Sequence, residues 1–184
     1  MAREYSEDTL IEQTAIDLFF NQLGWDTLLA YNNEGFGEDS TLGRLNKKEV
    51  VLKKTVLAKL KQFNPGLPDS AYKQAYEKLT EESSTKSLAE INHEKHQLLR
   101  NGIAIDFIND KGELVENKTL KVIDFAKAEN NNFLAVRQLW IDGKSGRQRR
   151  PDIIGFVNGI PLLFIELKAS HRKLENAYNE NFTD

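Results

Sequence analysis

The feature that most restricts the fold of this chain is the pair Asn158-Gly159, which stands between two apolar runs, 152–157 and 160–168. A type I′ turn needs a positive φ at both of its central positions, and Asn-Gly is among the pairs that adopt it most readily. The flanking runs are rich in the β-branched and aromatic residues that favour strands. The sequence therefore predicts an antiparallel hairpin in the last part of the chain.

Three charged residues lie at the open end of this hairpin. Asp152 begins its first strand, and Glu166 and Lys168 end its second. Glu166 and Lys168 are two residues apart, so they share a face of the strand. In antiparallel strands the numbers of paired residues have a constant sum. A two-residue turn makes that sum 317 and pairs Asp152 with Ile165, whereas a three-residue loop, 158–160, makes it 318 and pairs Asp152 with Glu166.

We predict the three-residue loop, because charges at the end of an apolar strand are costly unless they are paired or coordinated. Pro161 supports this prediction, since proline cannot donate to the ladder. Two carboxylates beside a lysine suit hydrolysis of a phosphodiester: the carboxylates hold Mg²⁺, which activates a water, and the lysine steadies the nucleophile or the developing charge. The simpler alternative is an ion pair at the strand end between Lys168 and one carboxylate.

A short basic segment precedes Asp152. It has four cations and no anion within seven residues: Lys144, Arg147, Arg149 and Arg150. The whole chain has a net charge of -3, so contact with DNA would depend on a local patch, a metal or another domain. This segment is our candidate for phosphate contact, and a solvated loop is the alternative.

The remaining periodicities predict a mixed α/β fold with helices beside a central mixed sheet. Apolar residues recur at helical spacing after an N-cap at Ser6 and stop at Gly24. Three lysine- and glutamate-rich helical segments then form a helical insertion at about 46–100, within a single domain covering 1–184. The predicted helices are 46–62, 69–80 and 84–100, and the predicted strands are 25–31, 103–108, 120–125, 133–141 and the two hairpin strands, with a last helix from about His171.

The composition excludes some classes of protein. There are no cysteines, so disulfides and thiolate metal sites are impossible. No apolar run approaches the length that spans a membrane, and the first residues have no apolar leader. We therefore expect a cytoplasmic protein.

At these residues the chain resembles the nuclease domain of the restriction (motor) subunit of type I restriction-modification enzymes, within the PD-(D/E)xK nuclease superfamily. The resemblance covers nearly the whole chain. The motifs that carry it are Leu23-Gly24-Trp25, Asp124-Phe125, Asn132-Phe133-Leu134 with Gln138, Arg150-Pro151-Asp152-Ile153, Phe156 to Leu162, and Ile165-Glu166-Leu167-Lys168.

The resemblance implies an Mg²⁺-dependent endonuclease acting on double-stranded DNA, with two-metal use open. Asp152 and Glu166 would be metal ligands, the backbone carbonyl of Leu167 would join them, and Lys168 would be the catalytic lysine. Glu12, on the first helix, is the candidate for the further acidic residue that the superfamily often has. Asn181 could occupy the position where the family often has a glutamine that contributes to DNA cleavage, and the sequence ends at Asp184, before any tyrosine of that motif.

The resemblance also implies a larger assembly. Methylation and specificity subunits would be partners, and ATP would be used only by translocase domains downstream, so we expect this chain to be a fragment. Two other functions fit the same residues. One is a stand-alone repair or junction-resolving nuclease of the superfamily, and the other is a catalytically silent domain that binds DNA or docks a subunit.

Overall fold

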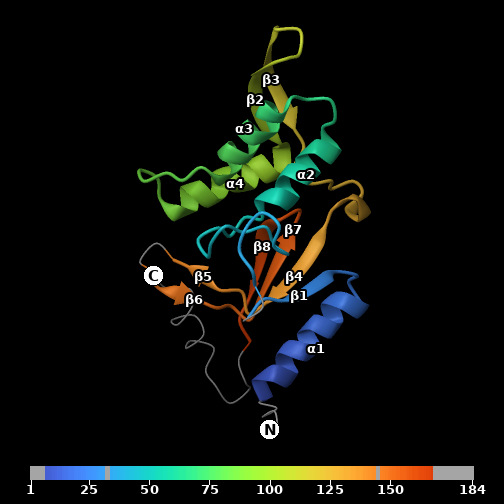
Figure 1. The fold of residues 1–184 in the computed structure, drawn as a ribbon, viewed down its shortest axis with the longest axis vertical. Coiled ribbons are helices and arrows are strands. Elements are labelled where there is room, and N and C mark those ends of the chain that lie inside the picture. Colours follow the sequence, from blue (N-terminus) through green and yellow to red (C-terminus); the bar gives the residue numbers. More distant parts are fainter. Residues whose placement is uncertain (1–6, 32–33, 144–145, 168–184) are drawn as a thin grey trace. The chain divides into compact units, whose positions relative to one another are not determined.

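The computed structural model describes residues 7–31, 34–143 and 146–167, with side chains from residue 11 onward. The chain forms two compact units, coloured along the sequence in Figure 1. One unit contains the chain up to Val50 and from Asn132 onward, and the other runs from Val51 to Asn131.

The first unit is built on a four-stranded mixed sheet. Its strands are β1 (Asp26–Leu29), β4 (Phe133–Arg137), β7 (Ile153–Val157) and β8 (Ile160–Ile165), in the order β1-β4-β7-β8. β1 runs parallel to β4, and the other pairs are antiparallel. A short hairpin of β5 (Ile141–Asp142) and β6 (Gln148–Arg149) lies between β4 and β7 in the sequence. The predicted mixed α/β architecture is confirmed.

Helix α1 (Glu7–Asn21) is joined to the sheet by apolar packing. Ile16 and Phe19 form one buried cluster with Ala135 on β4 and Ile153 on β7. The Trp25 ring lies 5.0 Å from the ring of Phe19 and extends this cluster to the start of β1. The helix ends where predicted, because Gly24 takes a positive φ of 68°. The predicted N-cap, Ser6, lies outside the described residues.

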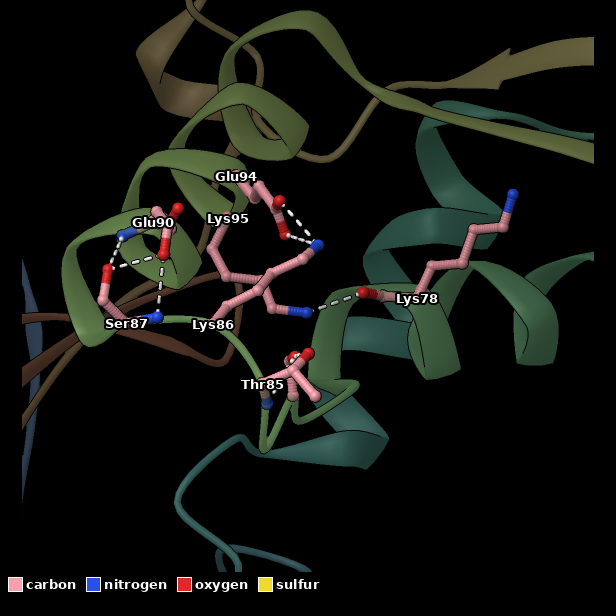
Figure 2. Close-up of polar contacts among 8 residues, drawn as sticks. Lys78, Thr85, Lys86, Ser87, Glu90, Glu94 and Lys95 are labelled. Atoms are coloured by element: carbon pink, nitrogen blue, oxygen red, sulfur yellow. Dashed lines mark hydrogen bonds and ion pairs between the residues drawn. The ribbon is translucent and has the colours of Figure 1, made fainter.

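The second unit contains three helices and a hairpin. The helices are α2 (Lys53–Phe63), α3 (Asp69–Thr80) and α4 (Leu88–Asn101), and the hairpin strands are β2 (Ile103–Ile108) and β3 (Leu114–Leu120), followed by a short 3₁₀ helix, Ala128–Asn130. Figure 2 shows the start of α4, where the Ser87 hydroxyl accepts a hydrogen bond from the Glu90 N–H and the Glu90 carboxylate accepts one from the Ser87 N–H. This capping box fixes the first turn of the helix.

One prediction for this region differs from the structure. The strand predicted at 120–125 is wrong, because β3 ends at Leu120 and Asp124 bends the following chain by accepting hydrogen bonds from the N–H groups of Ala126 and Lys127. The second compact unit, from Val51 to Asn131, contains the β2–β3 hairpin together with the three helices.

The strand predicted at 133–141 is interrupted. β4 ends at Arg137, and Gln138 adopts a φ of 55°, which a strand cannot contain. The backbone N–H of Gln138 still donates to the Asp152 carbonyl at 3.0 Å, so β4 and β7 stay in register up to this point. The turn at Gln138 places the amide of its own side chain beside Asp152, at the end of the sheet where the predicted site lies.

Candidate active site

The hairpin of β7 and β8 has the predicted register, although its loop does not have the predicted length. The connection is the two-residue turn Asn158-Gly159, with φ values of 53° and 82°, so the prediction of a three-residue loop is wrong. Near the turn, Val157 pairs with Ile160, a sum of 317, but Ile153 pairs with Ile165, a sum of 318. The change comes from a bulge between Gly155 and Phe156, which supplies the extra residue on β8 that the loop does not.

This bulge decides which residue lies opposite Asp152. The sum of 318 holds for the pairs nearest the open end of the hairpin, and one further step along the same register sets Asp152 opposite Glu166. A regular two-residue hairpin would have set Asp152 opposite Ile165. The preference of Asn-Gly for the tight turn and the register that the site requires are therefore both satisfied.

Both oxygens of the Asp152 carboxylate accept hydrogen bonds. Oδ2 accepts from the backbone N–H of Leu167 at 2.7 Å, and Oδ1 accepts from the Gln138 amide, Nε2, at 3.2 Å. The first bond ties the start of β7 to the segment that carries Glu166 and Lys168. A carboxylate has about four lone-pair directions, so each oxygen keeps the capacity to bind a further donor or a cation.

Glu12 of α1 reaches the same place. Its Oε1 accepts a hydrogen bond of 2.7 Å from Gln138 Nε2, the nitrogen that also donates to Asp152. Burial raises the pKa of Glu12, and the nearby charge of Asp152 raises it further, while Arg137, the hydrogen bond from Gln138 and Arg150 act in the opposite direction. Two carboxylates thus lie around one amide nitrogen, whose two hydrogens carry the partial positive charge that both can share.

The other predicted site residues are placed only in part. Glu166 is half-buried directly after β8, and its Oε2 atom is fully buried. Leu167 is half-buried and packs against the α1 cluster. Lys168, Asn181 and Lys144 lie outside the described residues.

The donor set fits a hard divalent cation. Mg²⁺ is commonly held by one or two carboxylates and keeps several waters, so it does not need a closed protein cage. Glu12, Asp152 and the Leu167 carbonyl carry oxygen atoms of the kind that such a cation binds. Among the residues that the structure describes, no group of three or more Asp, Glu, His or Cys side chains is gathered as a metal site. Glu12 and Asp152 are the two described carboxylates that Gln138 brings together.

A stack of aromatic rings and cations lies beside the site, and sequence reasoning missed it. The Arg150 guanidinium lies 4.8 Å from the ring centre of Tyr31 and 5.0 Å from that of Trp140, and the Lys47 amine lies 5.2 Å from the Trp140 ring. Arg150 is exposed and is two residues from Asp152. Contact with two rings reduces the conformational freedom of the Arg150 side chain, so less entropy is lost when the guanidinium binds an anion.

The segment that carries Lys47 is fixed by a buried ion pair. Arg44 is 1% exposed, and it forms a 3.2 Å ion pair with Glu34 and donates to the Trp140 carbonyl at 2.9 Å. Burial raises the pKa of Glu34, and the charge of Arg44 opposes that rise. The bond to the Trp140 carbonyl joins this segment to the chain that leads to Arg150, and loss of Glu34 would leave the Arg44 charge buried and uncompensated.

A mixed sheet with α1 on one face and carboxylates at the strand ends is compatible with the core of PD-(D/E)xK nucleases. The family model described as "Type I restriction enzyme R protein N terminus" matches residues 4–184. The chain belongs to this family.

Two relatives support the assignment. The chain is 32% identical over 173 residues to the type I restriction enzyme HindI endonuclease subunit of Haemophilus influenzae, which covers 92% of this chain and 16% of the relative. It is 28% identical over 188 residues to the putative type I restriction enzyme MjaIXP endonuclease subunit of Methanocaldococcus jannaschii, covering 99% of this chain and 17% of the relative. The chain thus spans about a sixth of the length of these relatives. No helix in the described residues is long and apolar enough to cross a membrane.

Proposed function

We propose that this chain is the Mg²⁺-dependent endonuclease domain of a type I restriction enzyme R subunit, hydrolysing phosphodiester bonds of double-stranded DNA. The observation that carries the proposal is the network at the end of the sheet, in which Gln138 joins Glu12 to Asp152 and the Leu167 N–H holds the other Asp152 oxygen. Three segments far apart in the sequence meet there, and each supplies a polar group of the kind that a phosphodiesterase needs.

The residues have separate roles in this proposal. Glu12, Asp152, Glu166 and the Leu167 carbonyl are the candidate metal ligands. Bound Mg²⁺ would supply a water of lowered pKa and polarise the phosphate. Lys168 would steady the attacking water or the charge that develops on the phosphate. Arg150, close to the rings of Tyr31 and Trp140, would hold a DNA phosphate beside the site.

The larger assembly is part of the proposal. The relatives are named endonuclease subunits of type I restriction enzymes, and most of their length lies beyond the part that matches this chain. We propose that the complete protein adds ATP-dependent translocase domains and works with methylation and specificity subunits in the cytoplasm. Translocation would then deliver duplex DNA to the site.

A plasmid-nicking assay tests the catalytic part. We expect the chain to nick supercoiled DNA when Mg²⁺ or Mn²⁺ is present, and Asp152→Asn to lose at least about 10²-fold in rate, since the neutral amide cannot ligate the metal as a carboxylate does. Asp142→Asn is the matched control, because Asp142 also accepts a glutamine amide bond, from Gln148 at 3.0 Å, but lies in the β5–β6 hairpin. Circular dichroism would verify folding. Equal rates for wild type and Asp152→Asn would contradict the proposed site.

A further inference from the structure

Gln138 combines two unusual properties. Its backbone adopts a φ of 55°, and its side-chain nitrogen lies within hydrogen-bonding distance of two carboxylates, Glu12 at 2.7 Å and Asp152 at 3.2 Å. The other non-glycine residues with positive φ among those that the structure describes are Asn117 and Asn158, both at 53°. Asparagine tolerates this conformation better than glutamine does. A glutamine at such a position indicates that its longer side chain has a use.

The positive φ directs that side chain. Gln138 follows β4 directly, and its N–H makes the next bond of the β4–β7 ladder, to the Asp152 carbonyl. An extended residue here would continue the strand, but the turn allows Leu139, which is fully buried, to enter the core while the Gln138 amide meets Glu12 and Asp152. The backbone conformation thus directs the Gln138 side chain toward the two carboxylates.

The amide NH₂ is well suited to hold two like charges. It has two hydrogens, so it can donate to both carboxylates at once, and it has no acceptor on the nitrogen. Two ionised carboxylates that approach one another repel, and half-burial strengthens the repulsion. A donor between them offsets part of this cost when no cation is bound.

We propose that Gln138 is a positioning residue, which holds Glu12 of α1 against Asp152 of the hairpin and so keeps the two carboxylates assembled for the metal. Glu12 comes from a separate helix, and among the residues that the structure describes it is Gln138 that joins its carboxylate to the sheet by a hydrogen bond. Without that bond Glu12 would lose its link to Asp152, and the ligand set would depend on the hairpin alone. The metal-binding consequence rests on the proposed function, but the assembly of the two carboxylates does not.

The test uses variants that accept the positive φ at position 138 but cannot donate to both carboxylates. Gln138→Asn keeps an amide and suits the positive φ, but it is shorter by one methylene, so it cannot reach both carboxylates. Gln138→Gly removes the side chain and accepts the same φ without strain. Gln148→Ala is the control, since Gln148 also donates to an aspartate, Asp142, but in the β5–β6 hairpin.

The first readout is metal-free. Thermal unfolding of wild type, Glu12→Ala, Gln138→Asn and the double variant forms a double-mutant cycle. We expect Gln138→Asn to lower Tm in the wild-type background by a few degrees, about 3 °C for one charge-assisted hydrogen bond in a chain of this size. The loss should be clearly smaller when Glu12 is absent. Additive losses would overturn the proposal, because they would show that Gln138 acts only through its own turn.

The second readout is the affinity for Mn²⁺ by titration calorimetry. We expect Gln138→Asn and Gln138→Gly to bind Mn²⁺ roughly 10-fold more weakly than wild type, as is usual when a residue that orients a metal ligand is lost, whereas Gln148→Ala should match wild type. Unchanged affinity in both Gln138 variants, with a wild type that binds Mn²⁺, would overturn the positioning role. A wild type that neither binds Mn²⁺ nor cleaves DNA would refute the proposed function, and the cycle would still decide whether Gln138 joins the two carboxylates.

Discussion

Gly155→Ala tests whether the bulge in the β7–β8 hairpin is as tightly packed as the structure indicates. Gly155 lies in the middle of β7, where it pairs with Ala135 on one side and Leu163 on the other. A Cβ at this position would lie 2.9 Å from the Leu163 Cβ and 3.0 Å from Trp25 Cζ3. Leu163 is also the first paired residue after the bulge that sets the register of the site.

Two effects of opposite sign determine the magnitude. The φ of Gly155 is not in the positive range, so alanine would suit the strand and stabilise it by about 0.5–1 kcal/mol relative to glycine. Crowding against a Cβ and an indole ring costs about 1–3 kcal/mol, because neither neighbour is the end of a flexible chain. The crowding is larger, and the expected result is a net loss of about 1–2 kcal/mol, or about 2–8 °C in Tm.

Thermal unfolding of the Gly155→Ala variant measures this loss, and an alanine substitution at Gly35 is the control. Gly35 has no positive φ, and an added Cβ there would approach nothing closer than the Ser40 Cβ at 3.9 Å. Gly35→Ala should therefore leave Tm unchanged or raise it slightly, by up to about 1 kcal/mol of stability. A Gly155→Ala protein as stable as wild type would show that β8 can move away, and the argument that the bulge fixes the register would fail.

Lys168→Ala should lose most cleavage yet retain Mn²⁺ affinity in calorimetry, because its proposed role is at the water or the phosphate; an equal collapse of both would make it structural. The chain alone should bind duplex DNA weakly, and Arg150→Ala should reduce the slope of log K against log salt by about 1, whereas Lys111→Ala, in the β2–β3 turn, should not. Tight binding that resists salt would instead favour a stand-alone nuclease. The hydrogen bond from Asn130 lowers the pKa of Asp124 below its ordinary 3.8, and the Lys127 N–H and Lys121 lower it further. Ionised Asp124 therefore stabilises the fold at pH values above 3.8. Wild type should then have a higher Tm than Asp124→Asn at pH 6, and the gap should close as the pH falls through the lowered pKa; a constant gap would contradict the assignment.

The hairpin shows how far the sequence could be interpreted. Asn158-Gly159 predicted the turn, and the requirement that Asp152 oppose Glu166 predicted a register sum of 318, which the structure has. The predicted loop length was wrong, because a bulge in β8 supplies the extra residue in place of a longer loop. Local turn chemistry favours the two-residue turn, and a bulge depends on packing between strands that no short pattern reports.

Contacts between distant segments were the part that could not be predicted. Tyr31 follows β1 and Trp140 follows β4, so the pairing of these strands brings both rings to Arg150, and the bond from Arg44 to the Trp140 carbonyl also joins distant segments. Gln138 was visible as one letter of a family motif, but nothing in its neighbours signals a positive φ. Its role becomes evident only when the Glu12 and Asp152 carboxylates are seen around it.

The pairing of β1 with β4 also has a kinetic consequence. Asp26 pairs with Leu134, so roughly a hundred residues must be spanned before this parallel ladder can form, and the unit from Val51 to Asn131 lies within that span. Closing a loop costs more entropy as it lengthens, about 0.6 kcal/mol for each doubling, and nonlocal strand pairing is slow. The local β7–β8 hairpin and the inserted unit can form early, whereas β1 must wait during synthesis until β4 has left the ribosome. We expect pulse-labelled hydrogen exchange during refolding to protect the amides of the β7–β8 hairpin first and those of the β1–β4 ladder last, which would make assembly of the carboxylates a final event of folding.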